Sequence, residues 1–397
     1  MNFFLLAVLK AAVVSLALLT TLAYLQWVER KVLGHIQARL GPQRVGPHGL
    51  LQPLADVIKL LTKEDLIPPH VSKFYYLLAP MLAVGLALTS IAVIPFGPRI
   101  EILGISTWMQ LTDVSIGVLV ILAISSMSVY SVALAGWSSN NKYALLGGLR
   151  SSAQMISYEL PMALALVAPL LVLNSLSLRE IVDAQQGYAF GILPRWNIFQ
   201  GPAPQLLSFF LFLIAGFAET NRIPFDLPEA ENELVAGFHT EYSAMKFASF
   251  FMAEYCHMIT FAAVATTLFL GGWHAPFPES LGSAYLPVLV FLTGAGVALY
   301  HGMNPARRRD RLSLPAAAIV FTCIALLFLV PGLDTILVPL FWFAAKTGIL
   351  LFAFIWIRGT LPRFRYDQLM RFAWTFMFPI AMLNLLVTGL VVALTPN

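Results

Sequence analysis

The chain alternates long apolar runs with short polar segments, and this pattern predicts a bundle of membrane-spanning helices. A helix needs about 20 mainly apolar residues to cross a bilayer. Ten runs reach or approach that length: 3–27, 74–97, 112–136, 152–174, 205–219, 241–271, 284–301, 312–333, 335–357 and 372–393. Backbone in hydrocarbon must satisfy its own hydrogen bonds, which such runs do as helices. We therefore expect an all-α, polytopic membrane protein of about ten spans, forming a single membrane domain over residues 1–397, with the fifth and seventh runs the shortest.

Two segments, 28–73 and 219–240, are too polar to span the membrane and too patterned to be disordered. The first contains the run HGLLQPLADVIKLLTKE. Its apolar and polar positions separate onto two helical faces, with Leu50, Leu51, Leu54, Val57, Ile58 and Leu61 on one and Gln52, Asp56, Lys59 and Lys63 on the other. This separation predicts an amphipathic helix that lies in the membrane interface.

Residues 278–333 differ from the other spans, because they form two plain apolar runs around the basic segment NPARRRDR. Neither run contains an acidic residue in its interior. The pattern predicts an extra transmembrane hairpin with a basic tip, and its simplest interpretation is a peripheral, lipid-facing addition.

Composition and charge fix the class and the orientation. Hydrophobic residues make up 59% of the chain and charged residues 11%, whereas soluble domains carry about 25% charge. If the first span ends in the cytoplasm, 18 of the 24 basic residues lie on that side, and only Arg99, Arg179 and Arg195 lie on the other. The positive-inside rule then predicts that both termini face the periplasm, with the first span retained in a bacterial inner membrane.

Cofactor chemistry is limited by what the sequence lacks. The two cysteines, Cys256 and Cys323, lie in separate spans and match no ligand spacing. There is no glycine-rich nucleotide fingerprint either. We therefore expect no flavin, iron–sulfur cluster or metal bound by this chain itself, and no binding of nucleic acid.

The most unusual polar feature is a group of seven carboxylates between residues 219 and 254, opposed only by Arg222 and Lys246: Glu219, Asp226, Glu229, Glu231, Glu233, Glu241 and Glu254. Carboxylates close to hydrocarbon are costly and usually handle charge or protons. Four of them fall within 226–233 and should titrate as a coupled set. A solvated acidic face that docks a partner is the alternative.

Three ionisable residues fall inside predicted spans. Glu159 and Glu254 are too deep to reach water by stretching, so each should face a hydrated or paired interior. Lys346 lies at the centre of its span and is the natural counter-charge for them, the alternative being a buried ion pair that only locks packing. Lys10 is nearer the end of its span and should reach the interface.

Four polar stretches resemble one known family: WVERKVLGHIQARLGPQRVGPHGLLQPLADVIKLLTKE, GWSSNNKYALLGGLRSSAQMISYE, AETNRIPFDLPEAENELVAGFHTEY and WIRGTLPRFRYDQLM. Together they look like the quinone-chamber subunit of respiratory complex I, the family of the bacterial NADH-quinone oxidoreductase H subunit and mitochondrial NADH dehydrogenase subunit 1. The resemblance covers about 1–277 and 335–390. The hairpin at 278–333 is absent from the pattern of this family, and Trp374-Thr375 stands where a Trp-Lys pair is expected.

The resemblance implies a subunit of a proton-translocating NADH:quinone oxidoreductase. Its substrate is a quinone, ubiquinone or menaquinone, reduced by electrons from NADH through flavin and iron–sulfur clusters in partner subunits. Other implied partners are peripheral quinone-site subunits, small membrane subunits, antiporter-like subunits and lipids.

The resemblance also implies site residues, none of them catalytic in the covalent sense. The quinone chamber would be lined by Glu29, Arg30, Arg39, Asp56, Arg222 and Phe225. The proton path would use Glu159, Glu219, Asp226, Glu229, Glu231, Glu233, Glu241, Glu254 and Lys346. Simpler roles are open: Glu29 and Arg30 as an interfacial charge pair, Asp56 paired with Lys59 one turn on, and Arg39 as an anchor to anionic lipid.

Two other functions fit parts of the sequence. The equivalent subunit of a membrane-bound hydrogenase would share the acidic loop without binding quinone. A stand-alone secondary transporter would be expected to show internal repeats with broken spans in matching halves, and the sequence has no such symmetry.

Overall fold

The computed structural model describes residues 3–395 except 103–104, 202, 227–235 and 306–309. The long helices are α1 (Phe3–Ile36), α3 (Lys73–Ser90), α4 (Gly117–Ser138), α5 (Lys142–Leu173), α9 (Ala244–Phe269), α10 (Leu286–Met303), α11 (Asp310–Leu327), α12 (Asp334–Thr360) and α14 (Phe378–Leu394). Shorter helices are α2 (Gln52–Thr62), α6 (Leu178–Ala184), α7 (Leu206–Glu219) and α13 (Tyr366–Phe372). The predicted all-α class is thus confirmed.

Nine helices of the described chain are long and apolar enough to cross a membrane, the last being a continuous segment from Tyr366 to Leu394. The fifth expected span, 205–219, is the helix α7, which has only 14 residues. It nevertheless packs against α5 and α9 inside the bundle. Its neighbours cover it there, so it need not match the full thickness of the hydrocarbon by itself.

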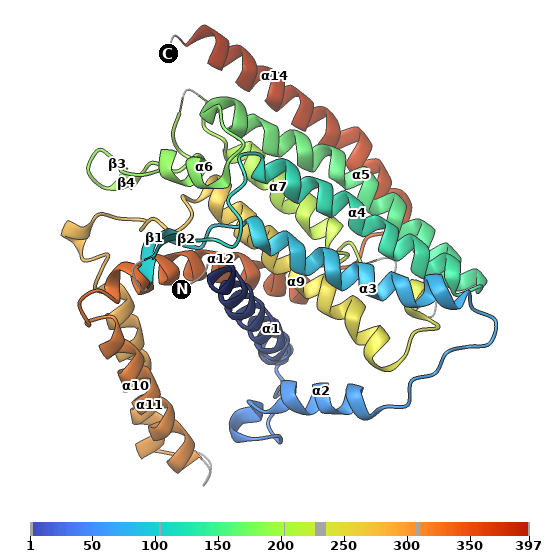
Figure 1. Ribbon diagram of the computed structural model, residues 1–397, viewed down its shortest axis with the longest axis horizontal. Helices are drawn as coiled ribbons and strands as arrows, with labels where there is room; N and C mark the ends of the chain where they lie inside the picture. Colours follow the sequence, from blue (N-terminus) through green and yellow to red (C-terminus); the bar gives the residue numbers. More distant parts are fainter. Residues whose placement is uncertain (1–2, 103–104, 202, 227–235, 306–309, 396–397) are drawn as a thin grey trace.

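Helices α3, α4, α5, α7 and α9 lie side by side in the main bundle, with α14 along α5 and α12 against α9 (Figure 1). Close approach depends on small residues. A Cβ added to Gly136 of α4 would come within 2.7 Å of the carbonyl oxygen of Ala144 on α5. Helix α9 is the most enclosed: 61% of its most apolar stretch is buried, against 11% in α1. The residues of α9 are therefore the best placed to form an interior site.

The two sides of the bundle carry different structures. One side carries α2 and is called the α2 side below. The other, called the strand side, carries α6 and two antiparallel hairpins, β1 (Gly97–Ile102) with β2 (Ile105–Met109) and β3 (Tyr188–Ala189) with β4 (Leu193–Pro194). The side chain of Lys10 joins α1 to this layer, because its Nζ donates to Thr107 Oγ1 at 2.6 Å and to the carbonyl of Trp108 at 2.7 Å.

The predicted amphipathic helix and extra hairpin are both helical in the structure. Helix α2 leaves its apolar side chains exposed, with Leu61 at 62%, as a helix lying on a membrane surface does. Helices α10 and α11 form an antiparallel pair that stands apart from the main bundle (Figure 1). The basic tip residues 307–309 lie outside the described residues.

Candidate functional site

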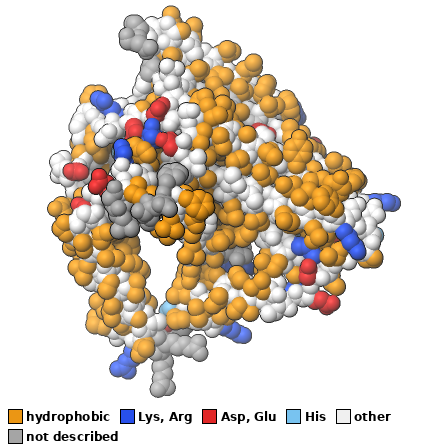
Figure 2. All heavy atoms as spheres, viewed as in Figure 1, with side chains coloured by type: hydrophobic (Ala, Val, Ile, Leu, Met, Phe, Trp, Pro, Cys, Tyr) orange, Lys and Arg blue, Asp and Glu red, His pale blue; other side chains and the backbone are white. Residues whose placement is uncertain are grey.

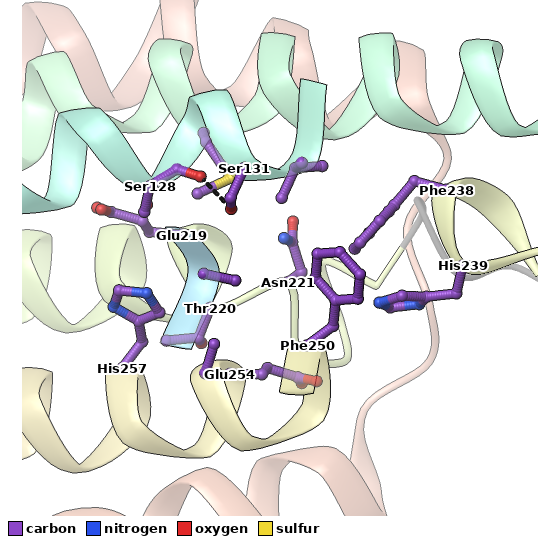
Figure 3. A pocket seen from close by; sticks show the side chains of 14 residues that line it. Ser128, Ser131, Glu219, Thr220, Asn221, Phe238, His239, Phe250, Glu254 and His257 are labelled. Atoms are coloured by element: carbon purple, nitrogen blue, oxygen red, sulfur yellow. Dashed lines mark hydrogen bonds between the residues drawn. The ribbon is translucent and has the colours of Figure 1, made fainter. Parts of the chain in front are cut away.

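A small polar cavity lies inside the bundle, between α4, α9 and the segment that follows α7 (Figure 3). Its volume is about 50 Å³. One water occupies about 10–15 Å³ on this measure, so the cavity has room for a few waters. The polar side chains that line it are Ser128, Ser131, Glu219, Thr220, Asn221, His239, Glu254 and His257. Two predicted proton-path carboxylates, Glu219 and Glu254, therefore line the same cavity from different helices.

Helix α4 brings a row of serines to this cavity. Ser125, Ser128 and Ser131 are three residues apart and share one helical face. The hydroxyl of Ser125 donates to the carboxylate of Glu219, and that of the neighbouring Ser126 donates to Glu159. Adjacent residues on one helix thus bind two carboxyl groups, which places Glu159 of α5 beside Glu219 at the end of α7.

A buried ion cluster centred on Arg222 lies beside the cavity. The guanidinium Nη1 of Arg222 is 3.1 Å from Glu29 Oε1, and its Nε pairs with Glu254. The ring of Tyr255 lies under the guanidinium at 4.2 Å, while its hydroxyl donates to Glu29 Oε2 at 2.7 Å. Arg358 of α12 makes a second ion pair with Glu29. Among the described residues, the carboxylates of Glu29 and Glu254 are thus paired with guanidinium groups, as a buried charge requires.

The side-chain amide of Gln154 binds the backbone of the loop that carries Arg222. The side-chain Nε2 of Gln154 on α5 donates to the carbonyl oxygens of Ala218 and Phe225, each at 2.8 Å, and lies 3.3 Å from Asn221 Oδ1. Gln154 is fully enclosed, at 1% exposure. Buried hydrogen bonds of this kind define a single arrangement of the backbone. Gln154 thus ties the Arg222 loop to α5, and the backbone N–H of Phe364 also holds it by donating to the carbonyl of Pro224 at 3.1 Å.

Two histidines complete the lining of the cavity. His257 lies three residues after Glu254 on α9 and so shares its face. His239, in the short turn after the acidic loop, packs among aromatic rings that include Phe238 and Phe251. Burial lowers the pKa of His239 to about 3. His239 is therefore a neutral imidazole at physiological pH.

The predicted chamber residues separate into groups. Glu29 and Arg222 meet in the ion cluster. Arg30 pairs instead with Asp56 of α2, Nη1 to Oδ2 at 2.8 Å, so the alternatives in which Arg30 pairs with Glu29 or Asp56 with Lys59 are wrong. Arg39 is exposed and bonds to Gln37 at 2.7 Å.

The predicted proton-path residues also separate. Asp226 pairs with Arg363 at 3.0 Å. Glu241 lies near the α2 end of the bundle, where the side-chain amide of Asn141 donates to it at 2.8 Å. Phe225, assigned to the chamber wall, packs against Tyr158 with 5.4 Å between ring centroids. Glu229, Glu231 and Glu233 lie outside the described residues.

Lys346 requires a correction. Its ammonium group donates to the backbone carbonyls of Leu270, Gly272 and His274 at 2.6, 3.0 and 2.6 Å, just past the C-terminal end of α9. Glu254 pairs with Arg222 and Glu159 with Ser126. The prediction that Lys346 is the counter-charge of these carboxylates is therefore wrong. The C-terminal end of a helix carries unpaired carbonyls and a partial negative charge, which suits an ammonium.

Several site residues were missed by reasoning from the sequence: Ser125, Ser126, Arg358, Arg363, His239, Tyr255 and His257. Two signals were available. The run SSMSVYS places hydroxyls at a spacing of three in an otherwise apolar helix, and His257 follows Glu254 by three residues. Arg358 and Arg363 could not have been chosen, because partners more than 100 residues away decide their role.

A metal centre is not indicated. Over the described residues, no group of three or more His, Cys, Asp or Glu side chains is arranged to hold a metal ion.

The fold and the site together define a multi-pass membrane protein with a paired, buried ion cluster beside a small cavity that carries polar side chains. The family profile described as NADH dehydrogenase matches residues 9–389. Similar proteins include the NADH-quinone oxidoreductase H subunit 1 of Solibacter usitatus, 66% identical over 394 residues that cover 99% of this chain and 98% of the relative. The H subunit 2 of Koribacter versatilis is 50% identical over 99% of this chain and 98% of the relative, and the H subunit 2 of Geobacter metallireducens is 45% identical over 99% and 97%. The chain belongs to the family of NADH-quinone oxidoreductase H subunits. Because the matches to these relatives cover 99% of the chain, the hairpin segment at 278–333 falls within the region of similarity.

Proposed function

We propose that this chain forms the membrane part of a quinone chamber and couples quinone reduction to proton translocation through its buried carboxylates. One observation carries the proposal: Arg222 contacts both Glu29 and Glu254. Glu29 lies on α1, the helix that leads into the α2 segment. Glu254 lines the cavity that also contains Glu219. A single side chain thus joins the face assigned to the quinone and the carboxylates assigned to protons.

The chemistry follows from charge balance. Quinone takes up two electrons and two protons to become quinol. The electrons come from NADH through flavin and iron–sulfur clusters in partner subunits, so this chain supplies the charged surroundings of the headgroup and no redox centre. Arg222 attracts both Glu29 and Glu254. A new charge beside Glu29 changes how strongly Arg222 interacts with each of these two carboxylates. Glu254 then gains or loses stabilisation as a carboxylate.

The energies have the required size. Two unit charges 4 Å apart interact by about 4 kcal/mol at an effective dielectric constant near 20. Moving one charge against 100 mV takes about 2.3 kcal/mol. A rearrangement of one ion pair in this cluster is therefore large enough to drive a proton step, provided that it is tied to electron arrival. Ser125 and Ser126 of α4 then connect Glu219 with Glu159. Glu159 lies on α5, from which the change would pass to the neighbouring membrane subunits.

Orientation and partners follow from the same proposal. The α2 side carries most of the basic residues and would face the cytoplasm, with both termini in the periplasm. Peripheral quinone-site subunits would cover the α2 side. Small membrane subunits and antiporter-like subunits would receive the proton signal laterally, and the complex would reside in a bacterial inner membrane.

The test is made on the assembled complex in proteoliposomes. Glu219→Gln and Glu254→Gln should lower NADH-driven quinone reduction or the protons moved per electron by at least about fivefold, because the amide keeps the shape and cannot ionise. Glu279→Gln, at an exposed site on the strand side, is the matched control and should retain both. Full coupling in both cavity variants would contradict the proposal. Hydrogen evolution without NADH oxidation would point to the hydrogenase-type alternative.

A further inference from the structure

The hairpin α10–α11 is attached to the rest of the chain at both ends. On the strand side, Val288, Ala325 and Phe328 form a small apolar core with Leu337, Val338 and Phe341 of α12. The indole Nε1 of Trp342 also donates to the carbonyl of Ser283 at 3.3 Å. The hairpin is therefore packed against α12 at this end.

At the other end, the described residues include a polar contact between the hairpin and the turn that follows α1. Asp310, the first residue of α11, has its Oδ1 3.2 Å from Nε2 of His48. His48 belongs to the Gly/Pro turn between α1 and α2. The carboxylate is mostly covered, at 13% side-chain exposure. We call this contact the latch.

Between these two attachments, the described residues of α10 and α11 pack mainly against each other. Small residues on its inner face, Ala295, Ala298 and Ala318, form their own core with Phe321. A Cβ added to Gly302 would come within 2.8 Å of Pro315, so the two helices touch closely near the α2 side. Large apolar side chains on the outside, such as Val297 at 59% and Ile319 at 65%, are exposed.

Because the hairpin contacts the rest of the molecule mainly at its ends, an opening lies between them (Figure 2). In this view α1 forms the opposite wall, α12 crosses one end, and the turn between α1 and α2 closes the other (Figure 1). The long walls on its two sides are mostly apolar (Figure 2). The described chain therefore frames a window between helices that are long and apolar enough to cross a membrane.

Three occupants have to be considered for such a window: water, a helix of a partner subunit, and the acyl chains of lipids. Water is excluded, because an apolar enclosure offers it no hydrogen-bond partners. A transmembrane helix of a partner running parallel to the hairpin inside the window would meet α12 at one end and the latch at the other. Acyl chains can enter sideways from the bilayer and adapt to the gap.

The charge around the latch selects the headgroup. Arg44 lies four residues before His48, and Arg311 directly follows Asp310; both side chains are exposed. Basic groups at the membrane surface attract anionic lipids by about 1 kcal/mol each. We propose that the window is a binding site for an anionic phospholipid, with acyl chains between the hairpin and α1 and the headgroup beside Arg44 and Arg311. This proposal does not depend on the function proposed above.

The experiment uses the assembled complex in nanodiscs with a photoreactive acyl-chain probe, either phosphatidylglycerol or the matched phosphatidylcholine. We expect the phosphatidylglycerol probe to label α10 and α11 at least about threefold more than the phosphatidylcholine probe. Leu386 and Leu390, on the exposed face of α14, are the internal control and should be labelled equally by both. The double variant Arg44→Gln, Arg311→Gln should abolish the preference on the hairpin and leave α14 unchanged.

Two results would overturn the proposal. Equal labelling of the hairpin by both probes would show ordinary bilayer lipid only. Near-complete cross-linking of a photoreactive residue placed at Val320 to another protein of the complex would show that protein fills the window. Opening the latch with His48→Ala should increase lipid exchange at the hairpin, and unchanged exchange would equally count against the site.

Discussion

Two buried charged sites involve α9, one within the helix and one just past its end, and they are built differently. About three turns into the helix, Glu254 belongs to a cluster of side chains in which Arg222 is shared between two carboxylates. Just past its end, Lys346 is held by three backbone carbonyls. Side chains can exchange partners when a nearby charge changes, whereas backbone carbonyls fixed in a turn cannot. The first site is suited to respond to charge and the second to hold structure.

The largest effect is expected from Arg222→Leu. Removing one partner of a buried ion pair leaves uncompensated carboxylates, at a cost of about 3–5 kcal/mol. We expect NADH-driven quinone reduction by the isolated complex to fall about 100-fold or more. Arg222→Lys keeps the charge but loses the planar fork and the stacking on Tyr255, and should lie in between. Near-normal turnover in Arg222→Leu would remove the distinction between the two sites.

Lys346→Met should affect stability and leave turnover nearly unchanged. The ammonium satisfies three carbonyls just past the end of α9, and hydrogen bonds to a charged group contribute about 1.5–3 kcal/mol each. We expect a lower thermal midpoint of the complex, followed by tryptophan fluorescence, with quinone reduction per assembled complex within about twofold of the original. A specific loss of proton pumping at normal stability would show that Lys346 takes part in coupling.

Tyr255→Phe tests one contact inside the responsive cluster. It removes the hydroxyl that donates to Glu29 at 2.7 Å and keeps the ring beneath Arg222. Loss of one hydrogen bond to a carboxylate, at the lower end of about 1.5–3 kcal/mol, predicts a decrease of roughly tenfold in quinone reduction. The decrease should be absent in Tyr285→Phe, at an exposed position on the strand side.

The smallest effect concerns pH. The pKa of His239 is lowered to about 3 from its usual 6.5 by burial, so the folded chain binds fewer protons than the unfolded chain between these values. Stability should therefore fall as pH falls below 6.5, by at most about 1.4 kcal/mol per pH unit. Thermal midpoints at pH 7.5 and 5.5 should differ less in His239→Asn. An equal difference in both proteins would mean that His239 is not the group concerned.

The fold was largely predictable, because apolar runs in a bilayer have few alternatives. The spans, the interfacial helix α2 and the hairpin α10–α11 all follow from the lengths and faces of these runs. The short helix α7 was harder to judge, since it has only 14 residues and its C-terminal half is buried by neighbouring helices that the sequence alone does not place.

The site was predicted only in part. Glu29 and Arg222 were predicted for the quinone chamber and Glu219 and Glu254 for the proton path, because charged residues in apolar surroundings are conspicuous; the structure brings members of both sets together around Arg222 and the cavity. Which charges pair was not predictable. Lys346 lies at the middle of its span, yet it binds the backbone of a turn past the end of another helix. Arg358 pairs with Glu29, which lies on a different helix. Which charges meet is set by helix packing, and pairs hundreds of residues apart leave no local signal.

The single amide of Gln154 has a mechanical consequence. It ties the backbone at Ala218 and Phe225 to α5, and α5 also carries Glu159. Any tilt or rotation of this helix must drag the Arg222 loop along with it. A displacement of α5 at Glu159 would thus be transmitted mechanically to the Arg222 loop, without a proton having to travel between them first.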